Sequence, residues 1–346
     1  MLAVVYKGNG RVALEERPMP VIQNDKDAII RVTLTTICSS DIHIKHGAVP
    51  RAVENTILGH EFVGEVIQTG NLVRRFKAGD RVAVNVETFC GECFYCKRGY
   101  VNNCTDPDGG WALGCRIDGG QAEYVRIPHA DQGLTLIPEG VSDEQALFTG
   151  DILSTGYWGA ELAEIRPADT VAVIGAGPTG LCTLMCAGLY GPSAVISIDV
   201  DDSRLELVRR EGLADVTLNP GDTDVRQRIL ELTGGRGADA VLEAAGSQES
   251  FRMAWQIARP NAVVCVIAMY EQAQTLPLPD MYGKNLVFKT GGVDASHCEE
   301  IMRLIACGKL DTRCLITHRT SLDNAMEAYR IFEQKEDSVI KWAIKP

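Results

Sequence analysis

The first part of the chain carries the alternating pattern of apolar and polar residues that half-buried strands show. Residues 27–35 place apolar side chains at every second position, and shorter extended runs follow at 81–86 and 123–127. Glycine and proline interrupt these runs, as they do in loops and turns. This part therefore predicts a small, loop-rich β domain.

The pattern changes near residue 170. Apolar, strand-like segments alternate there with helix-like stretches at intervals of about 20 to 30 residues, which is typical of βαβ units. The rhythm predicts a parallel, doubly wound sheet. The strand-like segments are residues 170–174, 194–198, 240–243 and 262–268.

Two amphipathic stretches, 297–307 and 322–332, follow, and Ser321 is placed to cap the second as a helix. The 346 residues exceed the size at which a single core stops growing, so we expect two domains with a hinge near 151–157. No apolar run approaches the roughly 20 residues that span a bilayer. A membrane protein is not expected.

Charge and cysteine content narrow the function classes. A net charge of −12 without a lysine or arginine block opposes binding to nucleic acid. Residues 1–10 lack the features of a secretory signal, which favours a cytoplasmic protein. In a reducing compartment the 12 cysteines are expected to be metal ligands and thiols rather than disulfides.

A glycine-rich motif follows the apolar segment 170–174 and opens a helix-like stretch. The first glycine permits a tight turn, the second lets backbone N–H groups approach a pyrophosphate, and the third allows the helix to pack closely on the strand. The motif predicts a dinucleotide site at Gly175, Gly177, Pro178, Thr179 and Gly180.

The choice of dinucleotide depends on acidic residues after the next strand. Asp199 follows the last glycine by about 20 residues, where a carboxylate accepts hydrogen bonds from ribose hydroxyls. Asp201 and Asp202 add negative charge that would repel a 2′-phosphate, and Arg204 could stack on or hydrogen-bond the adenosine end. We therefore expect NAD rather than NADP.

Four cysteines with short spacings lie within 15 residues, at Cys90, Cys93, Cys96 and Cys104. This spacing is typical of a structural zinc site, since four thiolates leave no open coordination position. A cluster of free or disulfide-bonded cysteines is the alternative. Few apolar residues lie in this loop, so metal binding is expected to order it.

Cys38 and His60 each end a strand-like segment, and each is weak evidence for a site when taken singly. In combination their surroundings resemble the zinc-containing medium-chain alcohol dehydrogenases, through Cys-x-Ser-Asp-x-His at 38–43 and Gly-His-Glu-x2-Gly at 59–64. The cysteine loop and glycine motif follow in the family's order. Segments 57–61, 110–111, 149–156 and 159–163 are most similar to the tetrameric secondary alcohol dehydrogenases of bacteria.

The resemblance implies an α/β fold with two domains. Residues 1–153 would form a GroES-like β-barrel catalytic domain, with 296–346 packing back on it, and residues 154–295 a Rossmann NAD-binding domain. It also implies a homotetramer, with a dimer as the alternative.

The resemblance further implies a catalytic zinc in addition to the structural one. Cys38, His60 and Asp151 would hold it, and Glu61 would be a neighbouring carboxylate or an occasional fourth ligand. As a Lewis acid, zinc lowers the pKa of the alcohol, and the nicotinamide takes up the hydride.

The remaining site residues are also taken from the resemblance. Ser40 would hydrogen-bond the substrate oxygen, and His43 would continue the proton path to water. Thr155 would join the cofactor site, and Trp111 and Tyr270 would line the substrate pocket.

The sequence thus favours an NAD-dependent, zinc-dependent oxidoreductase that interconverts a small secondary alcohol and its ketone. A polyol or threonine dehydrogenase of the same family is the alternative among enzymes. A noncatalytic dinucleotide-binding sensor or scaffold, and a purely structural zinc protein, are alternatives of other classes.

Overall fold

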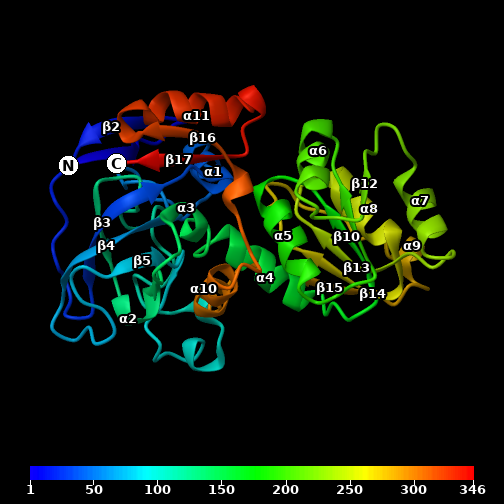
Figure 1. The fold of residues 1–346 in the computed structure, drawn as a ribbon, viewed down its shortest axis with the longest axis horizontal. Coiled ribbons are helices and arrows are strands. Elements are labelled where there is room, and N and C mark those ends of the chain that lie inside the picture. The colour runs from blue at the N-terminus through cyan, green and yellow to red at the C-terminus, as the bar shows by residue number, and fades with distance from the viewer. The chain divides into compact units, whose positions relative to one another are not determined.

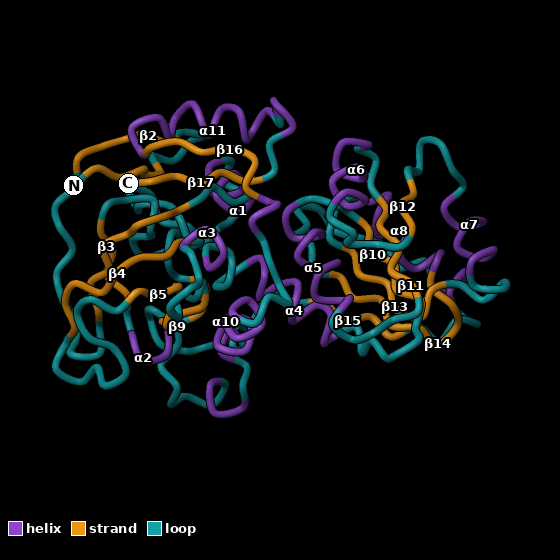
Figure 2. The backbone as a smooth tube through the Cα atoms, in the orientation of Figure 1, coloured by secondary structure: helices purple, strands orange, loops and turns teal.

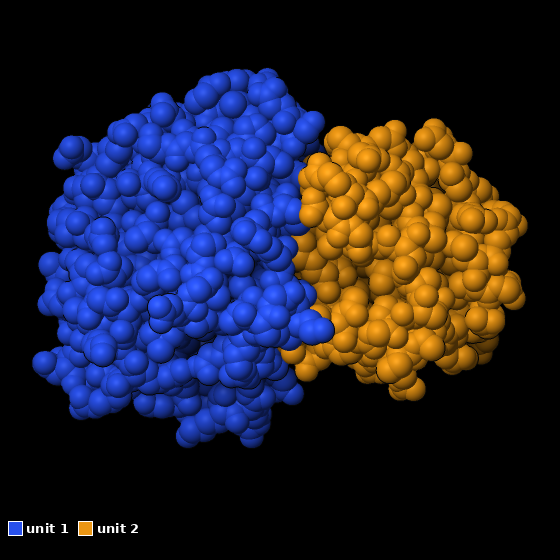
Figure 3. Space-filling model, in the orientation of Figure 1, with its two compact units in different colours: residues 1–154, 294–346 blue, residues 155–293 orange.

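The computed structural model describes residues 1–346, which form two compact units (Figure 3). Unit 1 comprises Met1–Ser154 and Asp294–Pro346, and unit 2 comprises Thr155–Val293. The boundary between Ser154 and Thr155 falls inside one helix, α4 (Ile152–Leu162). No helix has both the length and the apolar character that a membrane crossing requires.

Unit 1 is built on a seven-stranded sheet (Figure 1). Its path is β16-β17-β3-β4-β5-β9, and β8 pairs with β3. Only β16 and β17 are parallel. The strands are β3 (Ala28–Thr35), β4 (Phe62–Thr69), β5 (Arg81–Val84), β8 (Tyr124–Ile127), β9 (Leu134–Leu136), β16 (Ile316–Ser321) and β17 (Lys341–Lys345).

Alternation along these strands explains the core of unit 1. Ile30, Val66 and Val82 point to one side of the sheet and are fully buried with Phe62 and Leu134. Two small antiparallel pairs flank the sheet: β1 (Leu2–Tyr6) with β2 (Val12–Glu16), and β6 (Glu87–Thr88) with β7 (Gly110–Trp111).

Short helices complete unit 1. They are α1 (Ser39–Lys45), α2 (Ala130–Gly133), α3 (Asp143–Ala146), α10 (Cys298–Ala306) and α11 (Ala325–Gln334), with 3₁₀ turns at Cys96–Arg98, Val101–Asn103, Arg313–Leu315, Leu322–Asn324 and Glu336–Ser338.

The prediction that Ser321 caps a helix starting at Leu322 is wrong. The chain first makes the 3₁₀ turn Leu322–Asn324, so the α-helix begins only at Ala325. The Ser321 side chain makes no capping hydrogen bond and instead accepts one from Asn324.

Unit 2 is a doubly wound domain with six parallel strands in the order β12-β11-β10-β13-β14-β15. Numbered along the chain this order is 3-2-1-4-5-6, so it reverses beside β10. The strands are β10 (Thr170–Ile174), β11 (Ala194–Ile198), β12 (Val216–Leu218), β13 (Ala238–Glu243), β14 (Ala258–Val266) and β15 (Val287–Thr290).

Helices lie on both sides of this sheet (Figure 2). Because the strands are covered on both faces, β10 is buried at all five positions rather than at alternate ones. The predicted fold class is confirmed. The helices are α5 (Pro178–Gly188), α6 (Asp202–Arg210), α7 (Val225–Leu232), α8 (Gln248–Ile257) and α9 (Leu278–Met281).

Candidate metal and cofactor sites

Four potential metal ligands meet in unit 1. One donor atom each of Cys38, His60, Glu61 and Asp151 lies within 4.8 Å of the others. The first three side chains are buried and Asp151 is half-buried. Each of these residues lies just before a helix or strand: Cys38 before α1, His60 and Glu61 before β4, and Asp151 before α4.

The donor atoms suit zinc. Asp151 Oδ2 lies 3.2 Å from His60 Nε2 and 3.9 Å from Cys38 Sγ. A thiolate, an imidazole and a carboxylate are ligands that zinc accepts, and three protein ligands leave its fourth position open for chemistry. Oε1 of Glu61 is also buried without a hydrogen-bond partner and is a fourth possible donor beside these three.

A buried polar chain orients His60. Asp41 Oδ1 lies 3.3 Å from Nδ1 of His60, while Asp41 Oδ2 accepts hydrogen bonds from the Cys38 backbone and from Gln121. Tyr329 in turn donates to Gln121 at 2.7 Å. Burial lowers the pKa of His60, but the Asp41 and Asp151 carboxylates outweigh burial and raise it well above its usual value.

A second buried contact lies behind Glu61. Lys341 on β17 forms an ion pair with Oε2 of Glu61, and both side chains are only 1% exposed. Burial lowers the pKa of Lys341, but the negative charges of Cys38 and Glu61 raise it above its usual value. The lysine is therefore charged at neutral pH.

The proposed proton-transfer residues lie on α1. Ser40 is half-buried, and its Oγ lies 3.7 Å from Cys38 Sγ, beside the metal donors. His43 follows one helical turn later and is also half-buried. Residues three apart on a helix lie on the same side, so Ser40 and His43 are neighbours.

Trp111 lies against the metal donors. Its ring meets His60 edge-on, with 5.5 Å between the ring centroids. The guanidinium of Arg51 lies 5.0 Å from the Trp111 ring centroid, and Glu87 is paired with Trp111 across β6 and β7. Burial raises the pKa of Glu87 to about 8.

Tyr270, the other predicted pocket residue, belongs to unit 2. Its hydroxyl donates to Oε2 of Glu243 at 2.6 Å, and its ring packs edge-on against Phe251. Oε1 of Glu243 accepts from the backbone of Ala245 and Gly246. Tyr270 thus braces the turn after β13.

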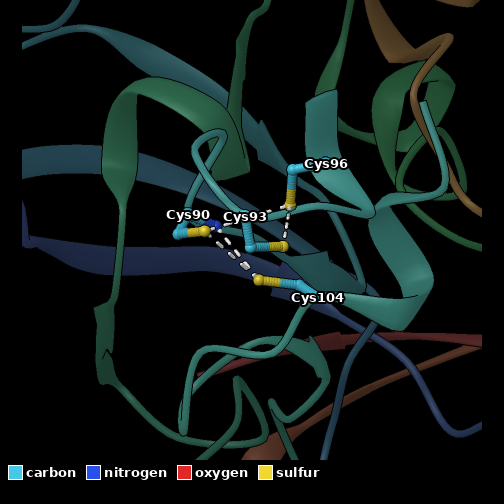
Figure 4. Close-up of side chains that lie close together, drawn as sticks. All are labelled: Cys90, Cys93, Cys96 and Cys104. Atoms are coloured by element: carbon cyan, nitrogen blue, oxygen red, sulfur yellow. Dashed lines mark hydrogen bonds between the residues drawn. The ribbon is translucent and has the colours of Figure 1, made fainter. Parts of the chain in front are cut away.

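The four cysteines of the loop converge, as Figure 4 shows. Zn–S bonds of about 2.3 Å place the sulfurs of a tetrahedral site about 3.8 Å apart. The measured Sγ–Sγ distances are 3.4 Å for Cys93–Cys96, 3.6 Å for Cys90–Cys104 and 4.0 Å for Cys90–Cys96. These distances fit one tetrahedral ion.

The glycine motif forms the turn between β10 and α5 in unit 2. Gly175 has a φ of +98°, and a Cβ on Gly180 would lie 1.8 Å from the Gly175 carbonyl oxygen. A Cβ on Gly177 would meet only Arg204, at 3.6 Å, so space remains beside it. Pro178 begins α5 at the switch point of the sheet, where such folds bind dinucleotides.

Asp199 lies at the end of β11, next to this turn. Its Oδ2 accepts from the Ala176 backbone at 2.6 Å, and its Oδ1 accepts from Asp201 at 2.9 Å. Arg204 lies 3.8 Å from the same carboxylate. Thr155 is half-buried on α4, whose next residue, Gly156, packs against the backbone of α5.

Sequence reasoning missed several residues that hold the donors in place: Asp41, Gln121, Tyr329 and Lys341. Asp41 was visible in the motif at 38–43, whereas the other three lie far from it in sequence and had no local signal. Arg51 and Glu87 beside Trp111 were missed for the same reason.

Both parts of the chain match known protein families. Residues 24–139 match the family profile "Alcohol dehydrogenase GroES-like domain", and residues 178–306 match "Zinc-binding dehydrogenase". An alcohol dehydrogenase of Cupriavidus necator is 38% identical over 100% of this chain and 99% of its own length. An NADP-dependent isopropanol dehydrogenase of Thermoanaerobacter brockii is 32% identical over 94% of each chain.

A solved structure of a zinc dependent alcohol dehydrogenase has a similar fold over the whole chain. The apo form of zinc dependent alcohol dehydrogenase 2 from Streptococcus pneumonia is 36% identical, with a TM-score of 0.94 over 100% of this chain and 98% of that one. The resemblance inferred from the motifs is confirmed. The chain belongs to the zinc-containing alcohol dehydrogenases, oxidoreductases that act on alcohols.

Proposed function

We propose that the chain is an NAD-dependent zinc alcohol dehydrogenase that interconverts a secondary alcohol and its ketone. The observation that carries this proposal is the cluster of Cys38, His60 and Asp151, with Ser40 beside it. In this proposal, residues 1–153 with 296–346 form the catalytic domain and 154–295 the NAD-binding domain.

Zinc held by these three residues would polarise the oxygen of the alcohol or ketone, and NAD would accept or return the hydride. Ser40 would accept a hydrogen bond from the alcohol and, as it takes the alcohol proton, release its own hydroxyl proton toward His43. His43, one turn away on α1, passes that proton toward water. Trp111 provides an apolar wall next to His60.

The preference for NAD is supported by Asp199. Its carboxylate is fixed by two backbone donors and keeps lone pairs that can accept from the ribose hydroxyls. A 2′-phosphate would meet this negative charge, together with Asp201 and Asp202. The relative from T. brockii is NADP-dependent, so the cofactor has to be measured directly for this chain.

One observation favours a polyol dehydrogenase as the second candidate. Oε2 of Glu87 and Nε1 of Trp111 are both buried without hydrogen-bond partners, and the Arg51 guanidinium lies over the Trp111 ring. Polar groups of this kind suit a substrate with a second hydroxyl better than a purely apolar alcohol.

A homotetramer is proposed from the resemblance and is supported by exposed apolar side chains in the segment that contains α9 and leads into the edge strand β15 of unit 2. Leu276, Leu278, Tyr282 and Val287 are 44%, 66%, 91% and 48% exposed. An open, apolar sheet edge is a natural site for pairing with another copy. Light scattering on the purified chain would give its mass.

A cytoplasmic location is proposed from the cysteines. None of the 12 forms a disulfide, which suits a reducing compartment.

The deciding experiment combines metal content with turnover. We expect two zinc ions per chain and NADH-linked reduction of ketones in a panel that also contains aldehydes, polyols, threonine and NADPH. Asp151→Ala should lose turnover and one zinc ion, whereas Asp222→Ala, at an exposed aspartate of unit 2, should lose neither. One zinc ion and no turnover in the unmodified chain would instead favour a noncatalytic dinucleotide-binding protein.

A further inference from the structure

Lys341 is a buried lysine at the edge of the proposed catalytic metal site. It is 1% exposed, and lysines are almost never buried to this extent unless they are paired. Its Nζ contacts Oε2 of Glu61 and donates to the carbonyl oxygen of Ile37 at 3.2 Å. The ring of Phe148 lies 5.5 Å from the same ammonium group.

These contacts reach two of the three chain segments that carry metal donors. Ile37 precedes Cys38, and Glu61 follows His60. Lys341 comes from β17, 280 positions away in sequence from Glu61. One residue thus ties the cysteine segment to the histidine segment and to the last strand of unit 1.

Glu61 has one oxygen engaged and one free. Oε2 is held by Lys341, whereas Oε1 is buried and has no hydrogen-bond partner. A Glu61 oxygen also lies within 4.8 Å of the donor atoms of the other three residues. Glu61 is therefore close enough to compete for a metal ion held by Cys38, His60 and Asp151.

The charges of the site indicate why Glu61 would compete for the metal ion. A Cys38 thiolate and an Asp151 carboxylate already balance a divalent ion, so Glu61 is a third negative charge in a buried site. A buried charge needs a partner. Lys341 is that partner, and without it the nearest positive charge available to Glu61 would be the metal.

We propose that Lys341 is a positioning residue that holds Glu61 outside the inner coordination shell and so leaves the fourth position of the metal to the substrate oxygen. The inference rests on the proposed function, because it presupposes a catalytic metal held by Cys38, His60 and Asp151.

The test replaces the catalytic zinc with Co²⁺, whose visible absorption responds to its ligands, and titrates the protein with imidazole as a probe of the open position. In Lys341→Met, Glu61 should occupy that position, so the Co²⁺ spectrum should change. We expect imidazole affinity to fall by about 10- to 100-fold, by analogy with the loss of metal affinity or activity when groups behind metal ligands are changed. Lys341→Arg keeps the positive charge and should retain imidazole binding.

Two further variants distinguish a positioning role of Lys341 from a general contribution to folding. Lys345→Met changes an exposed lysine of the same strand and should bind imidazole as the unmodified chain does. Lys341→Met combined with Glu61→Gln removes the competing carboxylate and should restore imidazole binding. Equal binding by Lys341→Met and the unmodified chain, or no recovery in the double variant, would overturn the proposal.

Glu61→Gln alone keeps the test decisive even if Lys341→Met does not fold. If Lys341 already holds Glu61 away, Glu61→Gln should leave the Co²⁺ spectrum and imidazole affinity unchanged, and a changed spectrum would show Glu61 to be a ligand despite Lys341. A chain that takes up no second metal would defeat the proposed function itself. Two metals with normal turnover and unaltered imidazole binding in Lys341→Met would defeat only this inference.

Discussion

Asp41 Oδ1 lies 3.3 Å from Nδ1 of His60, on the side of the ring opposite the nitrogen that faces Asp151. A carboxylate in this place favours a proton on Nδ1 and leaves Nε2 free to bind a metal. The other oxygen of Asp41 is held by the Cys38 backbone and Gln121, so the imidazole is oriented by a fixed group.

Asp41→Asn should therefore weaken the catalytic metal site without unfolding unit 1, because asparagine can still accept from the Cys38 backbone. We expect zinc affinity at this site to fall by about 10- to 100-fold. Competition with a coloured chelator measures this affinity, and the four-cysteine site serves as the internal control. Unchanged zinc affinity would mean that Asp41 does not orient His60.

Asp199→Gly should shift the cofactor preference. The loss of NAD affinity should be about tenfold or more, since hydrogen bonds to charged groups contribute roughly 1.5–3 kcal/mol. Because Asp199 also holds the Ala176 backbone, the quantity to compare is the ratio of the NAD and NADP dissociation constants. Asp202→Asn removes a nearby charge but spares that contact. An unaltered ratio in Asp199→Gly would refute the assignment.

Cys104→Ser should release the structural metal and disturb Trp111, which forms an apolar wall beside His60 in the proposed substrate site. Gly109 packs against the Cys104 sulfur, and Thr88 on β6 donates to the Gly110 carbonyl, which links the loop to β7. We expect one zinc ion fewer and a higher KM for the alcohol, with NAD binding intact. A loss of NAD binding of similar size would indicate general unfolding instead.

Glu87→Gln should change how stability depends on pH. Burial raises the pKa of Glu87 to about 8 in the folded chain, against about 4.3 for an unperturbed glutamate. Between these values the folded state binds more protons than the unfolded state, so the free energy of unfolding falls as pH rises. Glutamine does not titrate, so the variant lacks this pH-dependent contribution to the free energy of unfolding.

The variant should consequently gain stability relative to the unmodified chain between about pH 5 and pH 8. Chemical denaturation at several pH values measures the difference, with the exposed Glu249→Gln as control. A difference that stays constant over this range would contradict the prediction.

The sequence correctly predicted strands whose ends are marked by neighbouring residues. β10 and β11 have the bounds expected from the sequence, because each is a short apolar run that ends at a glycine or an aspartate. The start of α11 was misplaced by three residues because a 3₁₀ turn and an α-helix satisfy the same apolar spacing there.

The candidate site was predictable only where its residues belong to motifs. Cys38, His60 and the four loop cysteines stand in recognisable spacings, and the structure brings them together. Gln121 and Lys341 act through contacts that span 80 and 280 positions, which no local pattern encodes. Such residues become visible only when the chain is folded.

The separation of the donors in sequence also sets the order in which the two metal sites can form on a growing chain. Cys90 and Cys104 are 14 positions apart, and short loops close at a small entropic cost. The surroundings of Glu61 are complete only after Lys341 has been synthesised, 280 positions later. The ribosome therefore exposes all four loop thiols before Asp151, the last of the three catalytic donors, and long before Lys341, so the loop is expected to take up its zinc ion first.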